Sequence, residues 1–301
     1  MKLVSFGPQG QERPGVMHGA DAIVDLTLAS QGRISSIRNL LEQGEAGLDE
    51  VRKWLDHGPE QEWVKPADQV RFGPPVTNPT NIICLGLNYH NHAKEQDARL
   101  PERPLLFAKA VTSLAGNGDP IWYPADDKYL DYEAELAFVI GKPGFRIEPE
   151  EWESYIAGYT IVNDVSAREA QFSDRQWFRG KSCDSFCPTG PYLVTRDEIP
   201  DPHSLRLTAT LNGELRQDES SADLIFDIPK IIAHVSLDTT LLPGDVIPTG
   251  TPAGVGIFMK PPACMSVGDE ITISIEKLGS LTNKVEERKG KSLSVYPYTP
   301  A

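Results

Sequence analysis

Three carboxylates stand at alternate positions of an otherwise apolar segment, "LDYEAELAFVIGK" at residues 130–142. They are Asp131, Glu133 and Glu135, and alternate residues of a strand point to the same face. Carboxylates spaced about 7 Å apart on one face repel each other, and burial raises that cost. A solvated strand end would explain them, as would protonation, basic partners or a divalent cation. Oxygen ligands favour a hard ion, Mg²⁺ or Mn²⁺, with Ca²⁺ as the weaker alternative.

A second acidic position has a similar setting. In "GYTIVNDVSARE", Asp164 ends an apolar strand and precedes a helix-like segment. It could serve as a helix N-cap or as a metal ligand. If this strand and the first one end near each other, they supply three carboxylate ligands and leave coordination positions for water and substrate. That arrangement suits metal-assisted catalysis.

A histidine and a glutamate follow the apolar segment "NIICLGL". We expect Asn88 to cap a helix that begins near Tyr89, which places His92 and Glu95 on one face of that helix. A histidine oriented by a carboxylate is the usual general base, although a surface ion pair explains the same spacing. His90 points elsewhere, and its role stays open.

Two further segments could contact an anion. Lys181 lies in "WFRGKSCDSFCPTGP", where it could meet a substrate carboxylate or a developing oxyanion, or be an ordinary surface lysine. The glycine-rich segment "LLPGDVIPTGTPAGVG", residues 241–256, could hold a carboxylate with its backbone amides, or simply turn the chain between strands. It lacks the lysine and the spacing of a nucleotide-binding P-loop.

Length and charge limit the class of protein. The chain has 301 residues, 40% of them hydrophobic, enough for one large domain or one large and one small domain. A formal net charge of −14 argues against sequence-independent binding of nucleic acid or an anionic membrane. No apolar run could span a bilayer and no signal peptide is evident, so we expect a cytoplasmic protein. The four cysteines are expected to be free thiols, and the roles of Cys183 and Cys187 stay open.

The elements that must position these residues suggest an α+β, β-rich fold rather than a doubly wound sheet. Residues 1–70 are expected to form a small N-terminal α+β domain and linker, 71–290 the catalytic domain, and 291–301 a flexible tail. Asn212-Gly213 predicts a tight hairpin. Helices are expected in "ISSIRNLLEQ", "LDEVRKWLDH", "PEEWESYIAGY", "SAREAQFSDRQW" and "DIPKIIAHVSL".

Taken together, the segments resemble the fumarylacetoacetate hydrolase family. Five motifs occur in the family's order between Asn81 and Val285: N-Y-x-x-H-x-x-E, D-x-E-x-E, N-D-V-S-x-R, G-K-x-x-D-x-F-x-P-x-G-P and G-T-P-x-G-V-G. The resemblance implies a mixed β-roll, usually found in homodimers. It implies a Mg²⁺ or Mn²⁺ ion on Glu133, Glu135 and Asp164. It implies catalytic roles for His92, Glu95 and Lys181, and substrate contacts from Tyr89, Arg168, Gln171, Lys181 and Thr251.

The resemblance also suggests a reaction on a small anionic 2-oxo acid. Our main prediction is a metal-dependent hydrolase that cleaves a C–C bond of a 2,4-diketo acid of the acylpyruvate type, giving pyruvate and a carboxylic acid. His92, oriented by Glu95, would activate water, and Lys181 would neutralise developing charge. The alternatives are oxaloacetate decarboxylation, keto–enol tautomerisation or isomerisation at the same site. A non-catalytic carboxylate-binding protein is the alternative of another class.

Overall fold

The computed structural model describes residues 1–290, and a ten-stranded sheet runs through it. Its strands are β1 (Lys2–Phe6), β2 (Arg13–His18), β3 (Ala22–Asp25), β4 (Val64–Pro66), β5 (Phe72–Gly73), β8 (Leu114–Ala115), β11 (Ala134–Ile140), β12 (Ile156–Asn163), β14 (Cys187–Thr195) and β17 (Val246–Pro248). The main order is β17–β11–β12–β14–β1–β2–β3–β4, with β5 on β1 and β8 on β14.

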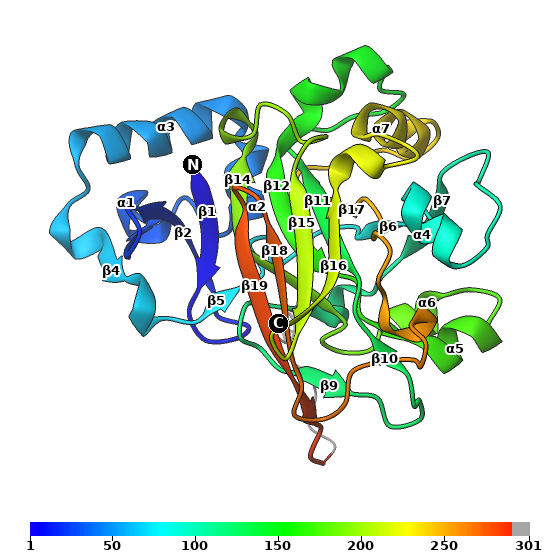
Figure 1. The fold of residues 1–301 in the computed structure, drawn as a ribbon. Coiled ribbons are helices and arrows are strands. Elements are labelled where there is room, and N and C mark those ends of the chain that lie inside the picture. Colours follow the sequence, from blue (N-terminus) through cyan, green and yellow to red (C-terminus); the bar gives the residue numbers. More distant parts are fainter. Residues whose placement is uncertain (291–301) are drawn as a thin grey trace.

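A second sheet of five strands lies across the first, in front of it in Figure 1. It contains β9 (Ile121–Tyr123), β15 (Arg206–Leu211), β16 (Glu214–Ser220), β18 (Glu270–Ile275) and β19 (Gly279–Glu287), in the order β16–β15–β18–β19–β9. Two smaller ribbons pair β6 (Ile83–Gly86) with β7 (Leu105–Ala108), and β10 (Leu130–Asp131) with β13 (Ser166–Ala167). The layers form a strongly curved, mixed β structure.

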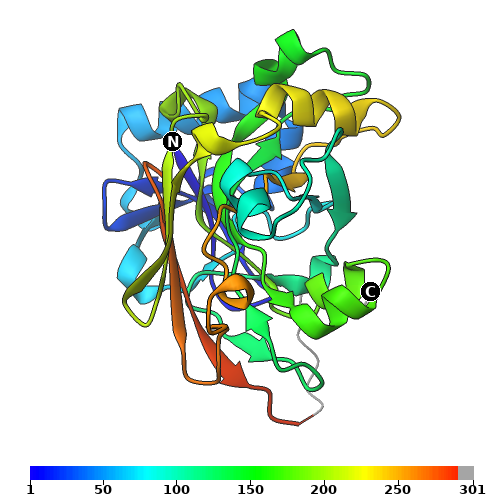
Figure 2. The ribbon, with the colours of Figure 1, turned by 45° about the vertical axis from the view of Figure 1, so that its right-hand side comes forward.

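Short helices surround the sheets. The α-helices are α1 (Leu26–Ala29), α2 (Ile37–Glu42), α3 (Gly44–His57), α4 (His90–Glu95), α5 (Arg168–Ser173), α6 (Phe178–Lys181) and α7 (Ile228–Ser236). Figure 2 shows cyan α4 between gold α7 above and green α5 and α6 below. Among the described residues, no helix is both long and apolar enough to cross a membrane.

Strand β11 is buried on both faces, which fixes the acidic segment that leads into it. Leu136 and Phe138 pack into the core between the two sheets. Ala137 and Val139 pack into the second core, under α2 and α3. A one-residue shift in register would exchange these two faces, so the packing holds the strand in a single position. The carboxylates at its start are therefore presented at a defined place.

Much of the expected secondary structure is confirmed. The fold is α+β and rich in strands, as predicted. Helices α2, α3, α5 and α7 overlap the segments where helices were expected, and α4 begins at His90, next to the predicted start near Tyr89. Helix α6 was not expected. Asn212 and Gly213 have φ values of 52° and 81°, the left-handed pair that a tight hairpin between β15 and β16 requires.

Other expectations need correction or stay open. Only Pro149–Tyr155 of the expected "PEEWESYIAGY" helix is helical, as a 3₁₀ turn, because Ile156 begins the apolar strand β12 between β11 and β14. Strand β1 pairs with β14, so the large sheet crosses the expected boundary near residue 70. Independent folding of the two parts stays a prediction. The expected tail, 291–301, lies outside the described residues.

Candidate active site and metal centre

Three buried carboxylates converge where β11 and β12 meet. One oxygen each from Glu133, Glu135 and Asp164 lies within 4.8 Å of the other two, and the residues are 5%, 1% and 0% exposed. The cause is local, because Ala134 of β11 pairs with Asn163 of β12. Glu133 therefore lies beside Asp164, and the Asp164 amide donates to the Glu133 carbonyl. The expected convergence of the two acidic segments is present, and the residues' role as ligands stays a prediction.

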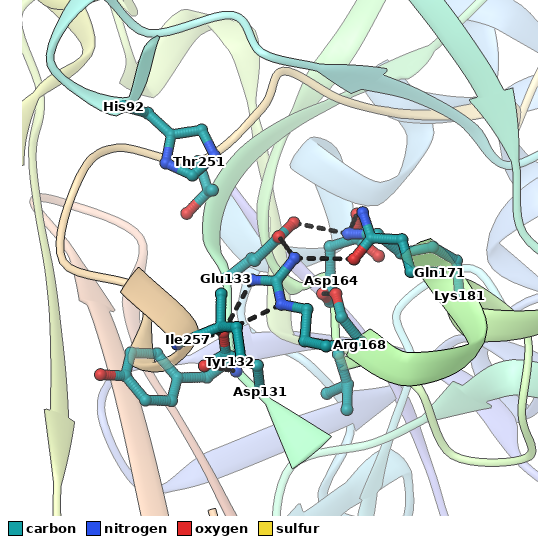
Figure 3. Close-up of polar contacts among 12 residues, drawn as sticks. His92, Asp131, Tyr132, Glu133, Asp164, Arg168, Gln171, Lys181, Thr251 and Ile257 are labelled. Carbon is teal, nitrogen blue, oxygen red and sulfur yellow. Dashed lines mark hydrogen bonds and ion pairs between the residues drawn. The ribbon is translucent and has the colours of Figure 1, made fainter. Parts of the chain in front are cut away.

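Asp131 does not share the face of the two glutamates, which corrects the expectation of three carboxylates along one strand. Strand β10 ends at Asp131 and β11 begins only at Ala134, so the alternation is interrupted. The Asp131 carboxylate instead accepts two hydrogen bonds from Arg168, at 2.9 and 2.8 Å. Figure 3 shows this pair below the glutamate that Arg168 also contacts. Asp131 therefore anchors the arginine.

Basic side chains neutralise much of the acidic cluster. Lys181 Nζ donates to Glu133 Oε2 at 2.6 Å and to Asp164 Oδ2 at 2.8 Å. Lys109 Nζ donates to Asp164 Oδ1 at 2.5 Å, and Arg168 lies 2.7 Å from Glu133 Oε1. Burial disfavours the ionised carboxyl, yet Lys181 and Arg168 outweigh it and lower the pKa of Glu133 to about 2. Glu133 is therefore an anion at neutral pH.

The basic side chains do not neutralise Glu135. Burial, with the charges of Asp164 and Glu133, raises the pKa of Glu135 well above its usual range. The buried charges of the site are those of Asp131, Glu133, Glu135, Asp164, Lys109, Arg168 and Lys181. While Glu135 is protonated, the other three carboxylates balance the three cations. When a bound metal ion makes Glu135 ionise, the seven groups carry one net negative charge, which the divalent ion reverses to one positive charge. The donors are all oxygens, so the residues fit a hard divalent ion that is joined by an anionic ligand.

His92 forms a chain of hydrogen bonds with two neighbours on and after α4. Its Nδ1 lies 2.6 Å from Glu95 Oε1, and its Nε2 lies 2.7 Å from Gln96 Nε2. An ionised carboxylate only accepts, so Nδ1 carries the proton and Nε2 keeps its lone pair. His92 is only 6% exposed, which makes this more than a surface ion pair. The ring is in the tautomer that a general base at Nε2 needs.

Asn88 does not cap this helix, contrary to the prediction. Tyr89 occupies the N-cap position, without a side-chain capping bond. The Asn88 amide donates to the carbonyls of Phe226 and Thr249 and accepts from the Phe226 amide. These three bonds satisfy a side chain that is almost fully buried, and an N-cap position would satisfy only one group. Asn88 therefore ties the start of α4 to two other loops.

The glycine-rich segment after β17 does hold carboxylates with its backbone amides, and they belong to the protein itself. Gly250 donates to Glu135, Gly254 to Glu95, and Gly256 and Ile257 to Asp131. One loop thus fixes the acidic cluster, the orienting partner of His92 and the anchor of Arg168. A side chain at Gly254, where φ is +103°, would also collide with the Arg216 carbonyl at 2.2 Å.

A cavity of about 170 Å³ lies beside the acidic cluster. Of the predicted site residues, it is lined by His92, Glu133, Arg168, Gln171, Lys181 and Thr251. Arg168 and Gln171 come from the first turn of α5, where Arg168 Nη1 donates to Gln171 Oε1 at 2.9 Å. Gly180 lets α6 approach α5, since a Cβ there would meet the Gln171 amide at 2.6 Å. That close packing brings Lys181 to the carboxylates. A larger hollow of about 380 Å³ beside α3 contains none of these residues.

Some residues differ in position from expectation, and two were missed. Tyr89 is fully buried in the core between the sheets and does not line the cavity, so its contact with substrate stays a prediction. Lys109 and Gln96 were not predicted. Lys109 follows β7 as the single charge after "LLFA", a pattern that could have marked it. No pattern in the sequence around Gln96 would have identified it as a site residue.

Comparisons with known proteins agree with this arrangement. A model described as fumarylacetoacetate (FAA) hydrolase C-terminal matches residues 81–286. The mitochondrial oxaloacetate tautomerase Fahd2a of Rattus norvegicus is 42% identical over 95% of this chain and 91% of its own length. Oxaloacetate tautomerase YisK of Bacillus subtilis is 44% identical over 72% of this chain and 73% of its own.

A solved structure adds a chemical comparison. Maleylpyruvate hydrolase from Sphingobium sp. SYK-6, in complex with manganese(II) ion and pyruvate, has a TM-score of 0.80. It is 30% identical, and the match covers 96% of this chain and 100% of that chain. A divalent ion is therefore plausible on the acidic cluster described here.

Proposed function

The chain belongs to the fumarylacetoacetate hydrolase family, and we propose that it is an enzyme that interconverts the keto and enol forms of oxaloacetate. This makes one of the alternatives from the sequence our main proposal, in place of C–C hydrolysis. The relatives named oxaloacetate tautomerases, at 42% and 44% identity, support the change. The single observation that carries catalysis is the His92 ring, with Nδ1 on Glu95 and Nε2 on Gln96, at the wall of a cavity beside the acidic cluster.

The residues that would hold a metal are Glu133, Glu135 and Asp164. A divalent ion bound there would supply Lewis-acid stabilisation of the negative charge that develops on the 2-oxo oxygen. With all four carboxylates ionised and a divalent ion bound, the site carries one net positive charge, which supports joint binding of the ion and the substrate's carboxylate. Mg²⁺ and Mn²⁺ both fit three carboxylate ligands with open positions.

The chain's own side chains would move the protons. In the keto-to-enol direction, His92 Nε2 accepts a proton from C3, the C3–H electrons form the C2=C3 bond, and the 2-oxo oxygen gains a proton. The ammonium of Lys181 lines the same cavity and is the proposed donor or stabiliser at that oxygen. Although burial favours the neutral amine, Asp164 and Glu133 raise the pKa of Lys181, so it enters as a cation. The reverse reaction uses the same groups.

Hydrolysis of an acylpyruvate remains a second candidate, because the manganese–pyruvate complex belongs to a maleylpyruvate hydrolase of the same fold. His92 could activate water for attack on a 4-oxo carbon as readily as it could accept a proton from C3. The two reactions differ in their products, since only hydrolysis releases pyruvate and a second acid. The expected homodimer and cytoplasmic location also stay proposals.

The test compares products from purified protein loaded with Mg²⁺ or Mn²⁺. Loss of enol-oxaloacetate is followed by ultraviolet absorbance, and pyruvate release is measured from acetylpyruvate and from oxaloacetate. Glu133→Gln is the site variant, and Glu150→Gln, at an exposed position, is the matched control. We expect rapid enol loss that requires metal and Glu133, with little pyruvate from either substrate.

Each other outcome has a defined meaning. Fast pyruvate release from acetylpyruvate without enol–keto catalysis would favour the hydrolase. Pyruvate release from oxaloacetate would favour decarboxylation. If the metal-loaded protein turns over none of the substrates, the proposal that it is an enzyme is contradicted, and a carboxylate-binding protein on this fold is favoured.

A further inference from the structure

The cavity side of His92 is covered by an amide. Gln96 follows α4 as its C-cap residue and lines the cavity beside His92. Its Nε2 lies 2.7 Å from His92 Nε2. Since Glu95 holds the other ring nitrogen, the amide donates to the lone pair that a general base must use. A substrate that gives a proton to His92 therefore has to take the place of this amide.

The displaced amide stays next to the reacting carbon. In oxaloacetate, the carbon that gives up the proton carries the C4 carboxylate, only one bond of about 1.5 Å away. When C3–H occupies the position facing His92 Nε2, the carboxylate on C3 lies close to where the Gln96 amide stood. A modest rotation of the long Gln96 side chain, which is only half-buried, brings its N–H group within hydrogen-bond distance.

The cations that line the cavity are engaged at its opposite, acidic end. Arg168 donates to Asp131, Glu133 and Gln171. Lys181 donates to Glu133 and Asp164. These groups surround the position where the 2-oxo acid end of the substrate would bind.

Apart from Gln171, whose amide lies beside Arg168, and Thr251, the rest of the cavity wall offers little to a second carboxylate. It is largely apolar, with the side chains of Leu87, Leu105, Phe107, Phe172, Trp177 and Phe258. A carboxylate desolvated against such a wall without a donor would be strongly disfavoured. Among the described residues that line the cavity, Gln96 is the amide donor beside His92.

We propose that Gln96 is a specificity-determining residue that donates a hydrogen bond to the substituent on C3, which is the C4 carboxylate in oxaloacetate. This inference rests on the proposed function and adds how the site recognises a four-carbon diacid. The donor is uncharged, so an acyl carbonyl at the same position could also accept its hydrogen bond. A 2-oxo acid with an alkyl group at C3 gains nothing from Gln96.

The test uses a pair of substrates that differ only in this group. Exchange of the C3 hydrogens in D₂O is measured by NMR for oxaloacetate and for 2-oxobutanoate, with full-length protein and saturating Mg²⁺. Gln96→Leu should raise KM for oxaloacetate about 10- to 100-fold, as expected for a lost hydrogen bond to a charged group. KM for 2-oxobutanoate should change less than about threefold. Lys94→Leu, at an exposed position on the same helix, should behave like the wild type on both substrates.

The isosteric variant Gln96→Glu separates recognition from folding. It keeps the side-chain shape and places a like charge beside the C4 carboxylate, so its KM for oxaloacetate should rise at least as much as in Gln96→Leu, while its KM for 2-oxobutanoate stays near that of the wild type. The new carboxylate also faces His92 Nε2 and favours the protonated ring, so kcat should fall on both substrates and only the KM values are compared. Equal rises in KM on both substrates in both variants would overturn the proposal and make Gln96 a positioning residue for His92. A wild-type protein that exchanges neither substrate would instead overturn the proposed function.

Discussion

Replacing Lys109 with methionine should destabilise the metal-free protein by about 3 kcal/mol. Lys109 Nζ donates to Asp164 Oδ1 at 2.5 Å and to the Val165 carbonyl at 3.2 Å, and both charged side chains are 0% exposed. Removing one partner of a buried ion pair leaves the other charge uncompensated, at a cost of about 3–5 kcal/mol. We take the lower limit because Lys181 still contacts Asp164 at 2.8 Å.

A divalent ion should recover much of this loss. In the variant, a bound ion compensates the negative charge of Asp164 in place of Lys109. The ion also binds that carboxylate without competition from the Lys109 ammonium. Lys109→Met should therefore bind Mg²⁺ or Mn²⁺ more tightly than the wild type does. Metal that binds only the folded state adds stability in proportion to the logarithm of its concentration over Kd. The stability gap between variant and wild type should consequently narrow at high metal concentration.

Thermal melting and metal titration of the same preparations measure both effects. At about 2–4 °C per kcal/mol, the chelated variant should melt roughly 6–12 °C below the wild type. The control is Lys53→Met, at an exposed position on α3, which should melt within about 2 °C of the wild type. If the metal-free variant melts at the same temperature as the metal-free wild type, the predicted stabilisation by the buried Lys109–Asp164 pair is refuted. Weaker metal binding would refute the competition between Lys109 and the ion.

Three further predictions follow from the site. His92→Ala should lower the rate about 100-fold or more while metal titration shows unchanged affinity, and unchanged turnover would remove His92 from the mechanism. Asp131→Asn should raise KM about tenfold by releasing Arg168, whereas the exposed Asp126→Asn should not, and equal kinetics would show that the anchor is dispensable. Burial, with Asp164 and Glu133, raises the pKa of Glu135, so this group stabilises the metal-free fold while protonated and loses that contribution as pH rises through its folded-state pKa. The metal-free Tm should fall as pH rises above about 4.3, and Glu135→Gln should flatten that slope; an equally steep slope in the variant would refute this origin.

The residues that the sequence predicted best are those whose partners follow from periodicity. Glu133 precedes β11 and Glu135 lies at its start, where apolar packing fixes the faces of the strand, and Asp164 directly follows the neighbouring strand. His92 and Glu95 are three apart on a helix, so their contact is local. The geometry of such pairs follows from the spacing of residues within one or two neighbouring elements, which the sequence shows.

The contacts that could not be predicted join distant parts of the chain. Lys109 contacts Asp164 across 55 positions, and although its place after an apolar strand could have marked it, nothing in the sequence identifies its partner. Asp131 belongs to an acidic alternation that a two-residue gap between β10 and β11 interrupts. The amides of Gly250 and Gly254 hold glutamates more than 100 residues away, which depends on the completed fold.

The most direct test of the central claim is the rate of C3 hydrogen exchange of oxaloacetate in D₂O, measured by NMR. The account predicts that protein loaded with Mg²⁺ or Mn²⁺ accelerates exchange well above the metal ion alone. It also predicts that chelation, Glu133→Gln and His92→Ala each return the rate to that background. Full exchange activity after exhaustive chelation, or in His92→Ala, would contradict it.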